Sequence, residues 1–179
     1  MSTRNMTAAM MAILAWAAYT SSVAQETPNL GRPVTPAEIA AWDISIPPDG
    51  TGLPPGSGTP AQGAVVYTQK CQSCHGEKGA GKPNDQLVGG QGTLTSASPV
   101  RTIGSYWPYA STVFDYVRRA MPYTESKSLT NDEVYAVTAY LLHLNGIIGA
   151  QDAMNAQSLP QVKMPNRDNF IVVYPIKPK

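Results

Sequence analysis

Hydrophobic residues recur at helical spacing only in the middle of this 179-residue chain. Thr59 is followed at once by Pro60 and, three residues on, by Gln62, which is a pattern typical of a capped helix start. Apolar positions then continue at helical spacing as far as Cys71. The pattern therefore predicts a first helix that starts at Pro60 and delivers Cys71 at its end.

A second helix is expected over residues 109–120, and Pro122 would stop it. Its buried face would carry Val113, Phe114 and Val117.

A third helix has the strongest local signals. Thr130 and Glu133 form a capping box, and Gly146 is a typical helix stop. The apolar stripe between them consists of Val134, Val137, Leu141 and Leu144. No alternation is long enough for a sheet, so the sequence predicts an all-α core.

Irregular segments flank this core on both sides. Residues 25–58 are rich in Pro and Gly, and neither helical nor strand periodicity survives there. Their apolar content favours a docking arm, with a partly disordered leader as the alternative. Residues 59–146 are expected to form the folded domain, and residues 147–179 an irregular C-terminal extension.

Residues 1–24 are typical of a signal peptide. Arg4 supplies the positive start, residues 8–19 form a short apolar stretch, and Ala24 ends a run of small residues suited to cleavage. The apolar stretch is too short to cross a bilayer as a helix. We therefore expect a periplasmic protein without a membrane span after cleavage, and a retained anchor is the alternative.

The charge balance excludes a basic nucleic-acid surface. The chain has 13 Lys and Arg against 12 Asp and Glu, and removal of Arg4 makes the numbers equal. With 16 Pro and 15 Gly, the composition favours a small core wrapped by irregular segments.

The chemistry of the chain is concentrated in Cys71-Gln72-Ser73-Cys74-His75, the attachment sequence of a c-type haem. Two thiols three residues apart can each form a thioether with a haem vinyl group, and the adjacent His then lies beneath the iron. Covalent haem attachment takes place outside the cytoplasm, which agrees with a signal peptide.

Two other interpretations of the cysteine pair remain open. A redox-active disulfide would be expected in a βαβ context, which the pattern does not show. A zinc site would need more ligands, and the chain offers His143 but no second cysteine pair.

The sequence also offers candidates for the second axial ligand of the iron. Met121 lies 46 residues after His75 and directly before Pro122, at the end of the second predicted helix. Met164 also precedes a proline, and His143 lies within the third helix. Met121 is the preferred ligand; Met164, His143 or an open site are the alternatives. A thioether ligand would favour electron transfer at a raised potential.

Residues 59–146 resemble the class I cytochromes c. The attachment motif, the Met-Pro pair and a closing helix occur in the order found in that family. Gly63 and Tyr67 stand where family members press a glycine and an aromatic residue against the C-terminal helix, here at Tyr140. The resemblance implies an all-α fold with three main helices around one haem c.

A narrower resemblance covers almost the whole mature chain. Residues 102–110 and 114–122, with flanking residues 46–54 and 163–168, are similar to the cytochrome subunit of sulfite or sulfane dehydrogenases, including the Sox sulfur-oxidation type. This resemblance implies a molybdenum-containing catalytic partner. Some relatives carry two haems, whereas this chain has one attachment motif.

Three further residues have expected roles around the haem. Trp107 could hydrogen-bond a haem propionate, and Arg101 could neutralise one. The second ring nitrogen of His75 is expected to donate to a carbonyl in the following loop, with Pro83 as the candidate.

The expected function is that of an electron-transfer subunit, which is not an enzyme by itself. Electrons would arrive from the dehydrogenase partner and leave to a downstream cytochrome or oxidase. The alternatives are a free-standing carrier for several partners, a haem-based gas sensor with an open iron site, and a small peroxidase, for which no distal acid–base residue is found.

Overall fold

The structure, a computed structural model, describes residues 30–171 and 173. These include the whole of the domain expected over residues 59–146. The predicted signal peptide, residues 1–24, lies outside the described residues. In the described part of the chain, no helix is both long enough and apolar enough to cross a membrane.

The chain divides into two units, residues 1–42 and 43–179. The described part of the first unit contains α2 (Pro36–Trp42), in a segment expected to be irregular, so that expectation is wrong here. The Thr35 hydroxyl accepts a hydrogen bond from the Glu38 N–H, and the Glu38 carboxylate accepts one from the Thr35 N–H. This capping box starts a helix despite the surrounding prolines.

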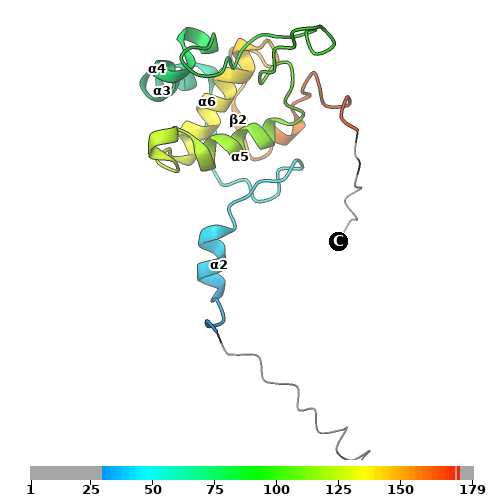
Figure 1. Cartoon of the computed structure of the whole chain (residues 1–179). Coiled ribbons are helices and arrows are strands. Elements are labelled where there is room, and N and C mark those ends of the chain that lie inside the picture. Colours follow the sequence, from blue (N-terminus) through cyan, green and yellow to red (C-terminus); the bar gives the residue numbers. More distant parts are fainter. Residues whose placement is uncertain (1–29, 172, 174–179) are drawn as a thin grey trace, which may run out of the picture. The chain divides into compact units, whose positions relative to one another are not determined.

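The described part of the second unit contains three longer helices and several short elements (Figure 1). The longer helices are α3 (Pro60–Lys70), α5 (Ala110–Ala120) and α6 (Asn131–Leu144). The short helices are α4 (Gln72–His75), η1 (Glu77–Gly79), η2 (Tyr123–Glu125) and η3 (Leu159–Gln161). The strands β1 (Ser57–Gly58) and β2 (Met154–Asn155) form an antiparallel pair. The helical class is confirmed, and the expectation of no sheet is wrong at this two-residue pair.

The longer helices begin and end close to the predicted residues. Thr59 and Thr130 cap α3 and α6, and both capping boxes predicted from the sequence are present. Helix α5 begins at Ala110, one residue later than expected, because Tyr109 has an extended backbone and is the N-cap. Pro122 follows the C-cap of α5 and so ends this helix as predicted.

Helices α3 and α6 approach so closely that residue 63 must be glycine. A Cβ atom at Gly63 would lie 1.9 Å from the carbonyl oxygen of Ala136 and 2.7 Å from the Cβ atom of Tyr140. One turn later, the rings of Tyr67 and Tyr140 pack with their centroids 5.4 Å apart. The contact of Gly63 and Tyr67 with the C-terminal helix is therefore confirmed.

Helix α5 packs on another face of α6. Phe114 and Tyr135 are fully buried there, and their ring centroids lie 4.4 Å apart. The predicted apolar faces are buried at Val113, Phe114, Val117, Val134, Val137 and Leu141. Leu144, the last residue of the predicted stripe, is only half-buried.

Part of the predicted docking arm belongs to the folded domain. Ile46 is buried, and its N–H donates a hydrogen bond to Asp115 Oδ1 on α5 at 2.9 Å. The Tyr135 hydroxyl donates to the carbonyl oxygen of Pro54 at 2.9 Å. Residues 43–58 are thus held against the helices, and the expectation of an independent arm fails for them.

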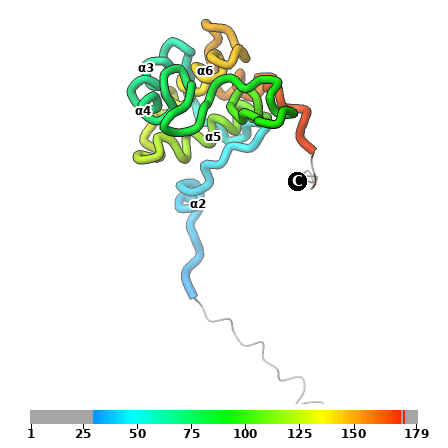
Figure 2. The backbone as a smooth tube through the Cα atoms, turned by 45° about the horizontal axis from the view of Figure 1, so that its top comes forward, coloured from blue at the N-terminus to red at the C-terminus, as the bar shows by residue number. Residues whose placement is uncertain are grey.

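The C-terminal extension also folds back in part. Met154, Leu159 and Met164 are buried in the core. The side-chain amide of Asn166 donates to the carbonyl oxygen of Tyr106 at 2.8 Å. Figures 1 and 2 both place the red end of this segment on the side of the unit away from α3 and α4.

We predict that Gly63→Ala destabilises the protein by about 1–3 kcal/mol, because the new methyl group would overlap the Ala136 carbonyl. Helix propensity alone would give the opposite sign, a gain of about 0.5–1 kcal/mol. Urea unfolding followed by circular dichroism measures the difference. The control is Ala61→Gly on the exposed side of the same helix. A more stable Gly63→Ala protein would contradict the close approach of α3 and α6.

Candidate haem site

The attachment motif lies at the junction of two helices. Helix α3 ends at Lys70, Cys71 connects it to α4, and His75 is the last residue of α4. The N–H groups of Cys74 and His75 both donate to the Cys71 carbonyl oxygen, at 3.1 and 3.0 Å. Both cysteines are free. The two thiols and the imidazole therefore lie on one short helical turn, as thioether attachment requires.

The imidazole of His75 is held by the loop that follows it. Its Nδ1 atom lies 2.9 Å from the carbonyl oxygen of Asp85. A carbonyl can only accept, so Nδ1 carries the proton and Nε2 keeps its lone pair for a metal ion. The expected acceptor, the carbonyl of Pro83, is wrong. Pro83 lies in a turn closed by the Lys82 N–H donating to the Asn84 carbonyl, and the chain reaches the ring only after this turn.

The chemistry of Cys71 does not favour the two alternatives to haem. Burial, with a smaller effect from Cys74, raises the pKa of the Cys71 thiol to about 11. Burial therefore makes this thiol a poorer nucleophile for disulfide exchange than an exposed cysteine. Within the described residues, no group of three or more His, Cys, Asp or Glu could hold a metal ion.

Met121 lies at the end of α5, and the segment that follows it contacts the residue before the attachment motif. It is the C-cap of the helix, with extended backbone angles, and Pro122 follows it. A few residues later, Glu125 forms an ion pair with Lys70 at 3.4 Å. Because Lys70 directly precedes Cys71, this contact brings the segment after Met121 to the segment that would carry the haem. An exposed ion pair of this kind adds little stability, but it shows that Glu125 and Lys70 lie close together.

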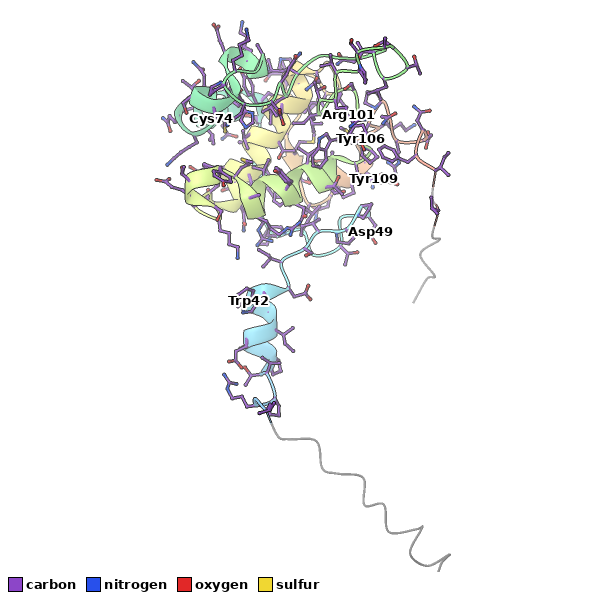
Figure 3. The ribbon with its side chains drawn as sticks, in the orientation of Figure 1. Trp42, Asp49, Cys74, Arg101, Tyr106 and Tyr109 are labelled. Atoms are coloured by element: carbon purple, nitrogen blue, oxygen red, sulfur yellow. The ribbon has the colours of Figure 1, made fainter. Side chains whose placement is uncertain are left out.

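The two other ligand candidates are placed less well. Met164 is buried and lines a cavity of about 580 Å³ together with Asp49. Figure 3 shows Asp49 and Cys74 on different sides of the second unit. His143 Nδ1 lies 3.4 Å from the carbonyl oxygen of Ile148, a contact just beyond the end of α6. These surroundings suit packing roles and leave Met121 as the preferred ligand.

The predicted propionate residues lie away from the cysteines. Figure 3 shows Arg101 and Tyr106 on one side of the unit and Cys74 on the other. The guanidinium of Arg101 lies 5.5 Å from the centroid of the Tyr106 ring, and Trp107 packs edge-on against Tyr116 at 5.8 Å. The vinyl and propionate groups of a haem leave from opposite edges of the ring. The propionate roles of Arg101 and Trp107 stay predictions.

Arg101 also borders a cavity of about 590 Å³ between two loops. The cavity is lined by the segment around Arg101 and Tyr106 and by Asn166 and Phe170 of the C-terminal extension. Trp107 does not line it. Arg101 and Trp107 thus contact different aromatic rings, Tyr106 and Tyr116, and only Arg101 borders the cavity.

Several apolar side chains of the second unit are only partly covered by the protein. Leu87, Val88, Trp107 and Met121 pack on the core but remain partly exposed. A flat apolar group joined to Cys71 and Cys74 would cover such a surface and exclude water from it. The free thiols, the fixed imidazole and this surface therefore fit a covalent haem.

Two features of the site were missed in the sequence. The Asp85 carbonyl acts through the backbone, and no side-chain pattern identifies such a group. The ion pair of Lys70 and Glu125 joins residues far apart in the chain, and their charges alone do not identify the pair.

Comparisons with known proteins agree with this geometry. The family described as "Cytochrome C oxidase, cbb3-type, subunit III" matches residues 58–141. A chain in the crystal structure of the sulfane dehydrogenase SoxCD from Paracoccus pantotrophus is 46% identical, with a TM-score of 0.76. The match covers 80% of this chain and 71% of that chain. No curated protein matches the sequence significantly.

We predict that Met121→Ala abolishes the weak sulfur-to-iron absorption band at the red end of the spectrum of the oxidised protein, because it removes the thioether ligand. The matched control is Met164→Ala. It should lower stability by about 2–5 kcal/mol as a buried cavity forms, but keep the band. Loss of the band only in Met164→Ala would overturn the assignment of Met121.

Proposed function

The chain belongs to the cytochrome c family, and on this premise we propose that it is the electron-accepting cytochrome subunit of a molybdenum-dependent sulfite or sulfane dehydrogenase. The observation that carries the proposal is the 46% identity to a chain of SoxCD over 80% of this chain. That likeness extends beyond residues 58–141, the part matched by the general cytochrome family. It therefore includes segments on both sides of residues 58–141.

The proposed site holds one haem c among α3, α5 and α6, joined to Cys71 and Cys74. A bound haem supplies one-electron transfer between ferric and ferrous iron. His75 would bind the iron through Nε2, and the Asp85 carbonyl keeps its ring in the required tautomer. Met121 would supply the other ligand, a thioether, which would stabilise reduced iron relative to a second imidazole. This pair suits a subunit that accepts electrons.

Other residues of the chain set the surroundings of the iron. Leu87 and Val88 present an apolar surface that excludes water, and a dry pocket strengthens the influence of nearby charges and dipoles on the iron. Arg101 and Trp107 are proposed to face the propionate edge, where a cation and an indole N–H stabilise carboxylates.

The proposed partner carries out the chemistry on the sulfur compound. Electrons from its molybdenum centre would reach this protein one at a time and then pass to a downstream cytochrome or oxidase. We place the process in the periplasm, because residues 1–24 have the pattern of a signal peptide and haem attachment takes place outside the cytoplasm.

Residues 30–42 are proposed as the arm that contacts the dehydrogenase subunit. Leu30, Val34 and Ile39 are 88%, 63% and 51% exposed, and α2 buries no residue. Since a seven-residue helix is marginal by itself in water, its apolar side needs a cover. The cap formed by Thr35 and Glu38 prepares the helix for docking.

We predict that affinity purification of the tagged cytochrome from its native host recovers molybdenum together with haem. Ile39→Asp should reduce the recovered molybdenum at least about tenfold, because it places a charge on the apolar side of α2. The absorption spectrum of the haem should remain unchanged in this variant, because residue 39 is outside the haem domain.

The matched control is Ala37→Asp, which adds the same charge to the opposite side of the same helix. It should leave recovery of molybdenum unchanged. Cytochrome recovered without molybdenum at native concentration and low salt would favour a free-standing carrier and would contradict the proposal.

A further inference from the structure

A buried asparagine at the end of α6 connects this helix to the loop that holds His75. Asn145 is the C-cap residue of α6 and is only 9% exposed. Its side-chain amide donates to the Leu141 carbonyl oxygen at 2.8 Å and to the Leu87 carbonyl oxygen at 3.2 Å. Its Oδ1 atom accepts from the Gly89 N–H at 2.9 Å. One side chain thus binds a helix end and two residues of the loop.

The loop residues held by Asn145 are directly connected to the segment facing His75. The Leu87 N–H donates to the Gly79 carbonyl oxygen at 2.9 Å, and the Leu87 carbonyl accepts a second bond from the Ile103 N–H at 3.2 Å. Asp85, whose carbonyl meets the His75 ring, lies two residues before Leu87.

The other side of Asp85 is held by the motif itself, since the Asn84 N–H donates to the Cys74 carbonyl oxygen at 2.8 Å. The segment carrying the Asp85 carbonyl is therefore fixed at both ends. One end depends on the attachment motif, and the other depends on Leu87 and its partners, which include Asn145.

Gly104 leaves room for the Asn145 side chain because it has no side chain of its own. A Cβ atom at Gly104 would lie 2.1 Å from Asn145 Oδ1 and 2.7 Å from Gln91 Nε2. Gly104 does not have a positive φ, so backbone strain does not explain a glycine here. The space it leaves is occupied by the amide of Asn145, which indicates that this contact is built into the loop.

We infer that Asn145 is a positioning residue for the axial ligand His75, acting through Leu87 and Gly89 on the Asp85 carbonyl. The inference rests on the haem ligation in the proposed function but not on the identity of the dehydrogenase partner. Asn145 does not touch the ring. It keeps the carbonyl within hydrogen-bond distance of Nδ1, which maintains the tautomer and the basicity of the ligand.

The test is the rate at which the His75 Nδ1 proton exchanges with water, measured by NMR on the reduced haem protein. Asn145→Asp keeps the shape but replaces the amide donors with a carboxylate oxygen facing two carbonyls. Exchange should accelerate roughly three- to tenfold, as expected for losing one hydrogen bond that keeps the loop closed. Gly104→Ala leaves Asn145 unchanged but pushes its side chain away from the loop with a new methyl group. This variant should also accelerate exchange of the Nδ1 proton, and it tests the inference if Asn145→Asp does not fold.

The matched control is Asn166→Asp. Asn166 is equally buried, and its amide donates to the Tyr106 carbonyl oxygen, outside the segment facing His75. It should leave the exchange rate unchanged. Unchanged exchange in both Asn145→Asp and Gly104→Ala, or equal acceleration in all three variants, would overturn the positioning role. If the unaltered protein shows no protected Nδ1 proton, the hydrogen bond from Nδ1 to the Asp85 carbonyl is absent from the haem protein and the inference fails. Ligation through Nε2 is not affected by that result.

Discussion

The crossing of α3 over α6 at Gly63 is the constraint on which the rest of the structure depends. It allows the backbone of α3 to meet the Ala136 carbonyl, and it sets the direction in which α3 delivers Cys71. The Tyr67 hydroxyl then donates to the Gly76 carbonyl oxygen at 2.9 Å, directly after the attachment motif. One close helix contact therefore fixes both the start and the end of the short turn that presents the thiols and the imidazole.

The loop beyond the motif is ordered by hydrogen bonds more than by apolar packing. Its backbone groups bond to one another around His75, and the Thr102 hydroxyl donates to the Gly89 carbonyl oxygen of the loop. The Asn145 side chain also bonds to this loop, at the Gly89 N–H and the Leu87 carbonyl oxygen. Such a scaffold can keep an axial ligand in one orientation while leaving apolar side chains partly exposed for a cofactor to cover.

The sequence predicted the parts of this fold that depend on local patterns. The structure confirms both capping boxes and the helix end before Pro122, because each depends on neighbouring residues. It also confirms Gly63, because no larger residue fits between α3 and α6. The packing of residues 43–58 on α5 was missed, since it depends on Ile46 meeting a distant carboxylate. The Asp85 carbonyl was missed because backbone acceptors carry no residue signature. The roles of the site residues remain predictions, and Met121 is favoured because the segment that follows it contacts Lys70, directly before the motif.

The flanking segments divide into parts that complete the domain and parts that remain exposed. Residues 43–58 and the buried stretch up to Asn166 close the core, whereas residues 30–42 keep apolar side chains in solvent. The account as a whole depends on the covalent bond between porphyrin and chain. Its most direct test is the intact mass of the mature protein after extraction with acidified organic solvent. We predict a mass raised by one haem, whereas a mass equal to that of the bare chain, with the pigment in the solvent, would contradict the account.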